Sequence, residues 1–178
     1  MLKSFYNAIQ ARLWQIYTQG EPTPNPDPEG DPIYPPAVQV IKQVGWWNEQ
    51  WAYEKELQPL KFPCVFIEIV SMPWEQFSNK VQQSTATIKL HIGSRTMDED
   101  SVDHLDLIEI INYWITGFQG TNFGTFTRTG FEADHNHDAL IAHTLTYKVR
   151  VQDNTAIRPR VRVEGDILVV ERFNTPEE

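Results

Sequence analysis

The residues most able to do chemistry lie in one short run, Asp134 to Asp138, with two histidines and two aspartates around an asparagine. In an extended backbone His135 and His137 point to the same side, as two ligands of one divalent metal ion must. The run also lies where a hairpin turn is expected, and Asp, Asn and His tolerate turn geometry. We therefore favour a turn that holds no metal, with a metal site at His135 and His137 as the alternative.

The rest of the sequence contains no recognisable catalytic motif. It has no phosphate-binding loop, no dinucleotide-binding fingerprint and no nucleophile elbow. The single cysteine, Cys64, lies in an apolar run typical of a buried strand, which favours a packed core residue. We expect His91 and His143 to be packed or hydrogen-bonded strand residues, and His104 to lie on an exposed helix face. The sequence therefore predicts a protein that is not an enzyme and that holds no cofactor or metal.

Length and charge narrow the class of protein further. A chain of 178 residues suits one domain, and a formal net charge of −9 argues against a protein that wraps DNA or binds acidic membranes. No uncharged apolar stretch reaches the length that crosses a bilayer, and the N-terminus lacks the pattern of a secretory signal. We therefore expect a protein without membrane contact that stays in the cytoplasm where it is made or is assembled there into something larger. Its six tryptophans favour interface contacts.

Hydrophobic periodicity predicts two helices and four main strands. Apolar residues three and four apart predict amphipathic helices over 2–17 and 101–116. The predicted strands are 63–70, 84–93, 125–132 and 141–151. This order predicts an α+β fold in which two helices pack on one face of a four-stranded antiparallel sheet. The predicted core residues are Phe5, Ile9, Leu13, Ile67, Ile88, Leu90, Leu105, Ile108 and Leu145.

Two segments lie outside this pattern, although 1–178 reads as a single domain. Residues 20–61 form a Pro- and Trp-rich insertion that begins with an acidic, proline-dense arm at 21–36. The arm is predicted to be extended, because proline removes backbone donors and disfavours helix in the residue before it. Residues 155–173 predict a C-terminal β-hairpin that turns at Gly165-Asp166. Each segment is either a contact with a neighbouring subunit or a surface decoration.

These two segments carry the predicted interface. Tryptophans crowd together in the first with little leucine beside them, and arginines gather in the second. A ring that pairs the acidic arm of one subunit with the basic edge of the next would use both. The alternatives are an aromatic mini-core and a solvated strand face. The predicted interface residues are Trp46, Trp47, Trp51, Arg158, Arg160 and Arg162.

The order of the elements also supports a resemblance. The matching features are the helix at 2–17, a strand that starts Phe62-Pro63, the alternating strand 84–93, the helix 100–116 with Leu-Asp-Leu-Ile-Glu-Ile-Ile, and a strand pair ending in His-Thr-Leu-Thr-Tyr-Lys-Val-Arg-Val at 143–151. In these features the chain resembles the tail-terminator and tail-completion family of long-tailed phages. The similarity covers about 2–19 and 62–152, and the arm, the Trp-rich stretch and the C-terminal hairpin depart from it.

That resemblance implies a structural virion protein that forms a ring, commonly a hexamer, at the head–tail interface. The ring would terminate the tail tube and join it to the head connector. Its partners would be other copies of itself, the connector or stopper protein and the tail tube protein, in a virion assembled in the bacterial cytoplasm. Genomic DNA would pass through the lumen without specific binding, which an acidic lumen favours. The alternatives are another neck, head-closure or baseplate ring component, a stand-alone binding module, and a small metal-dependent enzyme.

Overall fold

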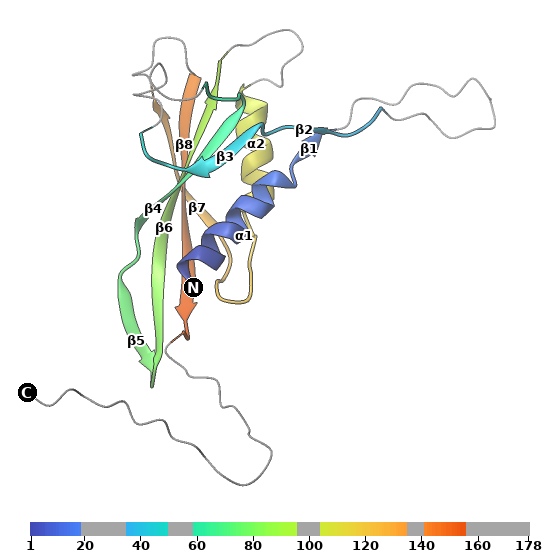
Figure 1. The fold of residues 1–178 in the computed structure, drawn as a ribbon. Coiled ribbons are helices and arrows are strands. Elements are labelled where there is room, and N and C mark those ends of the chain that lie inside the picture. The colour runs from blue at the N-terminus through green and yellow to red at the C-terminus, as the bar shows by residue number, and fades with distance from the viewer. Residues whose placement is uncertain (19–34, 50–58, 96–103, 135–140, 156–178) are drawn as a thin grey trace, which may run out of the picture.

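The computed structural model describes residues 1–18, 35–49, 59–95, 104–134 and 141–155 (Figure 1). The helices in these ranges are α1 (Leu2–Trp14) and α2 (His104–Ile115). The strands are β1 (Tyr17–Thr18), β2 (Val38–Gln39), β3 (Gln43–Trp46), β4 (Cys64–Ser71), β5 (Trp74–Ser78), β6 (Val81–Ser94), β7 (Thr127–Asp134) and β8 (Ile141–Asp153).

Six of these strands form one mixed sheet. Its order is β3-β4-β6-β8-β7, and β5 also pairs with β6. β3 runs parallel to β4, whereas the other pairs are antiparallel. β1 and β2 form a separate two-stranded sheet. The predicted four-stranded antiparallel sheet is therefore wrong: the fold is α+β, but the main sheet has six strands and one parallel pair.

The two additional strands explain the error. β3 is only four residues long and runs parallel to β4. Because parallel strands cannot be joined by a short turn, no turn signal in the sequence indicates this pair. β5 lies between the predicted strands 63–70 and 84–93, in a stretch where no strand was predicted. It pairs with the start of β6, which begins at Val81 instead of Ser84. β4 and β5 thus occupy successive parts of one edge of β6.

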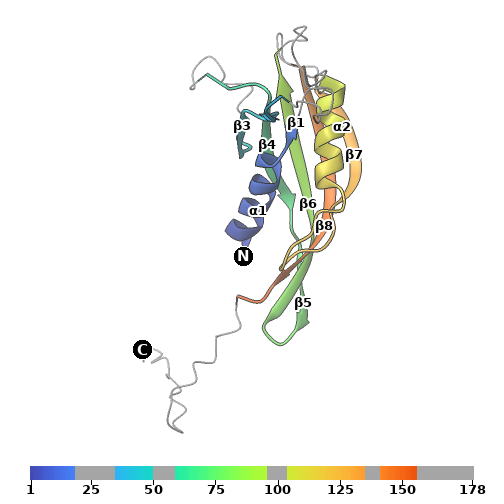
Figure 2. The same ribbon diagram turned by 90° about the vertical axis from the view of Figure 1, so that its right-hand side faces the viewer.

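Both helices pack on one face of the main sheet, and the core lies between them and the sheet. Alternate residues of the two longest strands, such as Leu90 and its partner Leu145, are fully buried in one cluster with Ile9 of α1 and Ile111 of α2. In Figure 2 the helices lie in front of the sheet, α1 towards β4 and α2 towards β7. The Arg12 Nε donates to the Trp114 carbonyl oxygen at 3.0 Å, which ties the helices together.

Two predictions about the burial of residues in α2 are wrong. Leu105 was predicted in the core, but it is 60% exposed, whereas Leu107 is 1% exposed. His104 was predicted on an exposed face and is buried. Apolar residues surround most of α2, so periodicity alone does not fix which face is buried. Similarly, Leu2 continues the apolar stripe of α1 but is largely exposed.

Several predictions fall outside the described residues. They are all but the last two residues of the arm at 21–36, all but Asp134 of the turn at 134–138 with both of its histidines, Trp51, and the hairpin after 155 with Arg158, Arg160 and Arg162. The single-domain assignment likewise stays a prediction. Among the described residues, the short β1–β2 pair brings Thr18 next to Val38.

Candidate functional site

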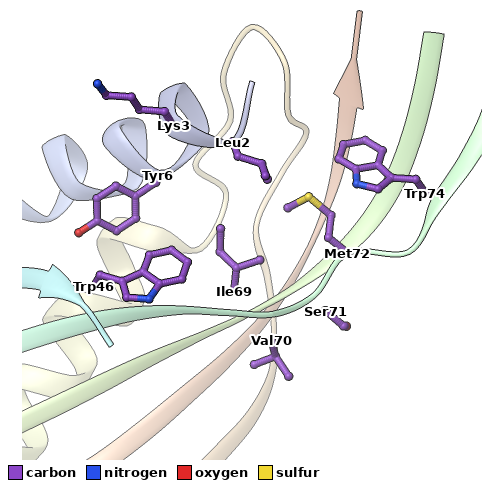
Figure 3. Close-up of a pocket in the computed structure, with 9 residues that line it drawn as sticks. All are labelled: Leu2, Lys3, Tyr6, Trp46, Ile69, Val70, Ser71, Met72 and Trp74. Carbon is purple, nitrogen blue, oxygen red and sulfur yellow. The ribbon is translucent and has the colours of Figure 1, made fainter. Parts of the chain in front are cut away.

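An apolar cleft of about 490 Å³ lies between the start of α1 and the junction of β4 with β5 (Figure 3). Four elements converge on it: the first two turns of α1, the end of β3, the end of β4, and the start of β5. Its lining residues are Leu2, Lys3, Tyr6, Trp46, Ile69, Val70, Ser71, Met72 and Trp74. We call this cavity the apolar cleft.

Local structure explains how these side chains come together. Leu2 and Tyr6 are four residues apart on α1 and therefore lie on one face of the helix. The Tyr6 ring packs against Trp46 with 5.5 Å between centroids. From the opposite side, Ile69 and Met72 point up from the strands towards the helix (Figure 3). β3 ends at Trp46 while β4 continues to Ser71, so the cleft occupies the space where β3 no longer covers β4.

The chemistry of the cleft is that of a binding surface. Among the described residues, its lining contains no carboxylate, imidazole or thiol. Its one charged residue is Lys3, which lies at the rim with its ammonium turned away from the cleft (Figure 3). Burial raises the pKa of Tyr6, so this phenol stays protonated at neutral pH and offers no base. Trp46 remains 50% exposed. A half-exposed tryptophan beside apolar side chains is typical of a surface that a partner covers.

A second cluster, which sequence reasoning missed, joins α2 to the sheet. Ser94 Oγ lies 2.6 Å from His104 Nδ1, and His104 Nε2 lies 2.6 Å from His143 Nδ1. Phe131 stacks on the His143 ring with 5.1 Å between centroids. The one available signal was the position of His104, three and four residues before the buried Leu107 and Ile108.

A serine hydroxyl next to an imidazole is also an arrangement found in nucleophilic catalysis. Here both Ser94 and His104 are buried, and neither lines the apolar cleft or the second cavity of about 240 Å³ near Asn122. The second histidine stands where a catalytic carboxylate would orient the base. This chain of hydrogen bonds therefore fits a structural role, in which buried polar groups satisfy one another and fix α2 to β6 and β8.

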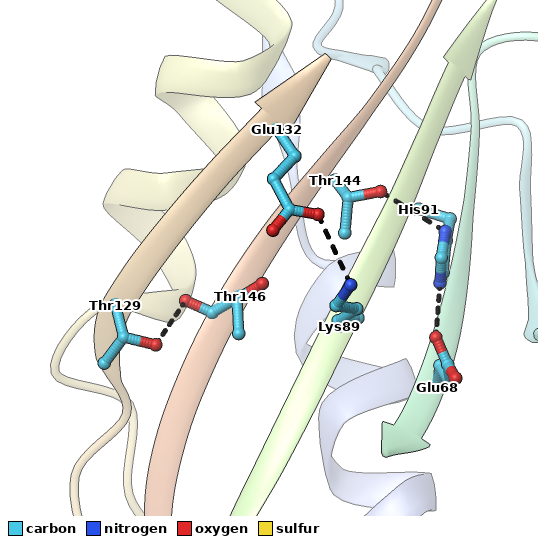
Figure 4. Close-up of polar contacts among 7 residues, drawn as sticks. All are labelled: Glu68, Lys89, His91, Thr129, Glu132, Thr144 and Thr146. Carbon is cyan, nitrogen blue, oxygen red and sulfur yellow. Dashed lines mark hydrogen bonds and ion pairs between the residues drawn. The ribbon is translucent and has the colours of Figure 1, made fainter. Parts of the chain in front are cut away.

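The face of the sheet turned away from the helices carries polar contacts (Figure 4). His91 Nε2 lies 2.7 Å from Glu68 Oε2, and its Nδ1 lies 3.3 Å from Thr144 Oγ1. Lys89 Nζ lies 3.4 Å from Glu132 Oε2. The prediction that His91 and His143 are packed, hydrogen-bonded residues is therefore confirmed.

The two described tryptophans of the predicted interface lie in different surroundings. Trp46 lines the apolar cleft, as an interface residue would. Trp47 is half-buried and stacks on the His91 ring, with 3.9 Å between centroids, next to Phe66. The structure thus does not bring Trp46 and Trp47 into one patch. The remaining predicted interface residues lie outside the described residues; they are Trp51, Arg158, Arg160 and Arg162.

Comparison of the chain with models of known protein families found no match, and neither did a search of curated proteins. The described ranges hold no group of three or more His, Cys, Asp or Glu side chains that could bind a metal ion. Both α1 and α2 fall short of the length and apolarity that a bilayer-crossing helix needs.

Proposed function

We propose that this chain is a structural virion protein that assembles into a ring at the head–tail interface of a long-tailed phage. In that role it ends growth of the tail tube and joins the tail to the head connector. The observation that supports the proposal is the apolar cleft. Its lining is mostly apolar and, among the described residues, lacks the acid, base and thiol groups of an active site. The order of helices and strands that resembles the tail-terminator family supports the choice of assembly.

The distribution of exposed apolar residues supports assembly as well. Large apolar side chains remain exposed near both edges of the sheet. A partner that removes them from water would stabilise the assembly. Near the cleft they include Leu2, Trp46 and Val70, and near the other edge they include Phe131. A head-to-tail ring uses two different surfaces of each subunit, so exposed patches at two edges suit that symmetry.

The charge of the chain suits a ring through which DNA passes. A formal net charge of −9 repels the phosphate backbone and disfavours trapping of the genome in the lumen. Another neck, head-closure or baseplate ring would share these properties. The position of the ring in the particle separates those roles.

The proposal is tested first on the purified full chain. Light scattering coupled to size exclusion should give a mass that is an integer multiple of 20.7 kDa, and negative-stain electron microscopy should show rings. A monomer at all accessible concentrations would contradict ring assembly.

The second test removes the gene from the phage or prophage that encodes the chain. Lysates should then contain filled heads without tails and tails of abnormal length, and the intact gene supplied in trans should restore joined particles. Normal tail lengths with missing baseplates would instead place the ring at the other end of the tail and would overturn the head–tail assignment.

A further inference from the structure

The outer edge of β4 next to the apolar cleft has no partner strand among the described residues. The Ile67 carbonyl oxygen accepts a hydrogen bond from the Trp47 N–H at 2.9 Å, so the backbone of Ile67 faces β3. Backbone groups alternate sides along a strand, and those of Ile69 therefore face the same edge. β3 ends at Trp46, and no strand among the described residues pairs with this edge beyond Ile67.

An open edge beside an apolar cavity is the geometry of strand addition. Unpaired backbone groups of the edge bind an extended segment, and a neighbouring pocket takes every second side chain of it. Here the outer edge of β4 passes directly below the apolar cleft, and Ile69 of β4 and Met72, just after β4, point into the cleft (Figure 3). The occupant should therefore be extended, with apolar side chains at alternate positions and an acidic group for Lys3.

The C-terminal sequence of the chain has this pattern. Residues 167–173 read Ile-Leu-Val-Val-Glu-Arg-Phe, and β-branched residues favour strands. In an extended conformation Ile167, Val169, Glu171 and Phe173 share one face. That face has three apolar side chains and one carboxylate, which complements an apolar cleft with one lysine, Lys3, at its rim.

The position where β8 ends favours a second copy over the same chain. β8 ends at Asp153, which pairs with Gln82 of β6, and β6 separates β8 from β5. In its own copy, the chain beyond β8 would have to pass around the tip of the β5–β6 hairpin to reach the outer edge of β4. We therefore take the donor to be a second copy, whose segment is not bound to this path.

We propose that residues 167–173 of one copy add a strand to the open edge of β4 in a second copy, with Glu171 next to Lys3 of the receiving copy. The contact rests on the proposed function, since it joins neighbouring subunits of the ring. Because donor segment and receiving edge are different surfaces, each copy donates to one neighbour and receives from the other, which closes into a ring.

Zero-length carbodiimide cross-linking tests the contact without changing the chain. Equal amounts of unlabelled and ¹⁵N-labelled protein are mixed under conditions that allow exchange of subunits, cross-linked and digested. Mass spectrometry should find an amide between Lys3 and Glu171, with half of the linked pairs of mixed isotope composition. Pairs of only pure composition would place the segment in its own copy and would overturn the proposal, as would the absence of this link.

A matched variant controls for accidental proximity. The double variant Glu171→Gln with Arg172→Glu keeps a carboxylate in the segment but moves it to the opposite face of the strand. The Lys3 cross-link should then be lost. A link from Lys3 to the new carboxylate at position 172 with equal yield would show that the segment is not held as a strand and would overturn the proposal.

A second pair of variants tests whether the cleft is the receiving site. Leu2→Glu places a charge in the cleft, in the first turn of α1, where an acidic residue does not disfavour the helix. Leu105→Glu makes the same change in the first turn of α2, at a residue of similar exposure away from the cleft. Leu2→Glu should shift the elution of the full chain from ring to monomer, and Leu105→Glu should leave it unchanged.

The outcomes separate this inference from the proposed function. Rings and joined particles that persist in Leu2→Glu and after deletion of 157–178 would overturn the strand addition and leave the ring assignment in place. The opposite result is also possible: the unchanged protein forms the Lys3–Glu171 link between copies, but deletion of its gene leaves heads and tails joined normally. In that case the contact is supported and the proposed head–tail function is refuted.

Discussion

The buried face of α2 gives the sharpest test of the structure, because sequence and structure disagree about it. Leu105 and Leu107 are both leucines of one helix, two residues apart. The apolar pattern places Leu105 in the core, whereas the structure leaves it 60% exposed and buries all but 1% of Leu107. Leu105→Ala and Leu107→Ala therefore make the same chemical change in opposite environments.

The expected magnitudes differ severalfold. Leu→Ala removes three carbon atoms, and at roughly 0.8 kcal/mol for each buried methylene the transfer contribution alone is roughly 2.4 kcal/mol. The cavity left between α2 and the sheet adds to this, so Leu107→Ala should lower the free energy of unfolding by about 2–5 kcal/mol. Leu105→Ala should change it by less than about 0.5 kcal/mol, because most of its side chain is already in water.

Urea unfolding followed by tryptophan fluorescence measures both values, with the slope m fitted separately for each variant. The experiment is run at two protein concentrations, since assembly would add a concentration-dependent contribution to apparent stability. An equal m in both variants shows that neither change alters the surface exposed on unfolding. If Leu105→Ala destabilised the protein more than Leu107→Ala, the rotation of α2 described above would be wrong.

Three further perturbations test other parts of the structure. His104→Ala should lower the free energy of unfolding in urea by about 1–3 kcal/mol, because it leaves the buried Ser94 hydroxyl without its histidine partner. A change within about 0.5 kcal/mol would contradict the hydrogen bonds that link Ser94, His104 and His143. Burial raises the pKa of the Cys64 thiol to about 12, so a thiol reagent should label Cys64 at mildly alkaline pH only after unfolding, and rapid labelling of the native protein would contradict its burial. Burial also raises the pKa of Tyr147, so the unfolded chain loses this proton first as pH rises and the free energy of unfolding should fall above about pH 10. The free energy of unfolding of the Tyr147→Phe variant should fall less steeply with pH in this range. Equal slopes for the variant and the unchanged protein would show that Tyr147 does not contribute to the pH dependence.

The long central strands could be predicted because their environment is uniform. β6 and β8 have the helices on one face and polar contacts on the other, so Ala86, Ile88, Leu90 and Ile92 alternate with Thr87, Lys89 and His91 along β6. A period of two is the direct result of that environment. The same holds for the stripe of α1, where Phe5, Ile9 and Leu13 are buried as their spacing predicts.

The errors arise where the environment changes along an element. β4 is buried on both faces at its start and partly exposed at its end, so it has no single period to detect. β5 is exposed at most positions, and its pairing with β6 depends on backbone hydrogen bonds that leave no hydrophobic pattern. The parallel β3–β4 pair depends on contacts between segments whose connection is too long for a turn signal. Sequence reasoning therefore found the centre of the sheet and its β7 edge, and did not place β3 and β5 at the other edge.

The burial of His104 is a different kind of error. A lone histidine in a helix is expected to face water, because burying an unpaired imidazole costs free energy. That cost disappears when partners are present, and the partners of His104 come from β6 and β8, far away in the sequence. Their positions could not be deduced before the register of the sheet was known. Since Ser94 and His143 lie at the same end of those strands, the register itself creates the site that accepts the helix.

The apolar cleft follows from the same edge of the sheet that sequence reasoning missed. Leu2, Ile69 and Met72 have the composition of core residues, and a complete four-stranded sheet under two helices would have buried them. They line a cleft because β3 stops at Trp46 and leaves the end of β4 uncovered. Extending β3 along β4 would cover the same residues and would make the strand edge unavailable to another chain. A short β3 is therefore the feature that leaves these core-like residues lining a cleft, and it is this edge of β4 where we propose that a second copy adds a strand.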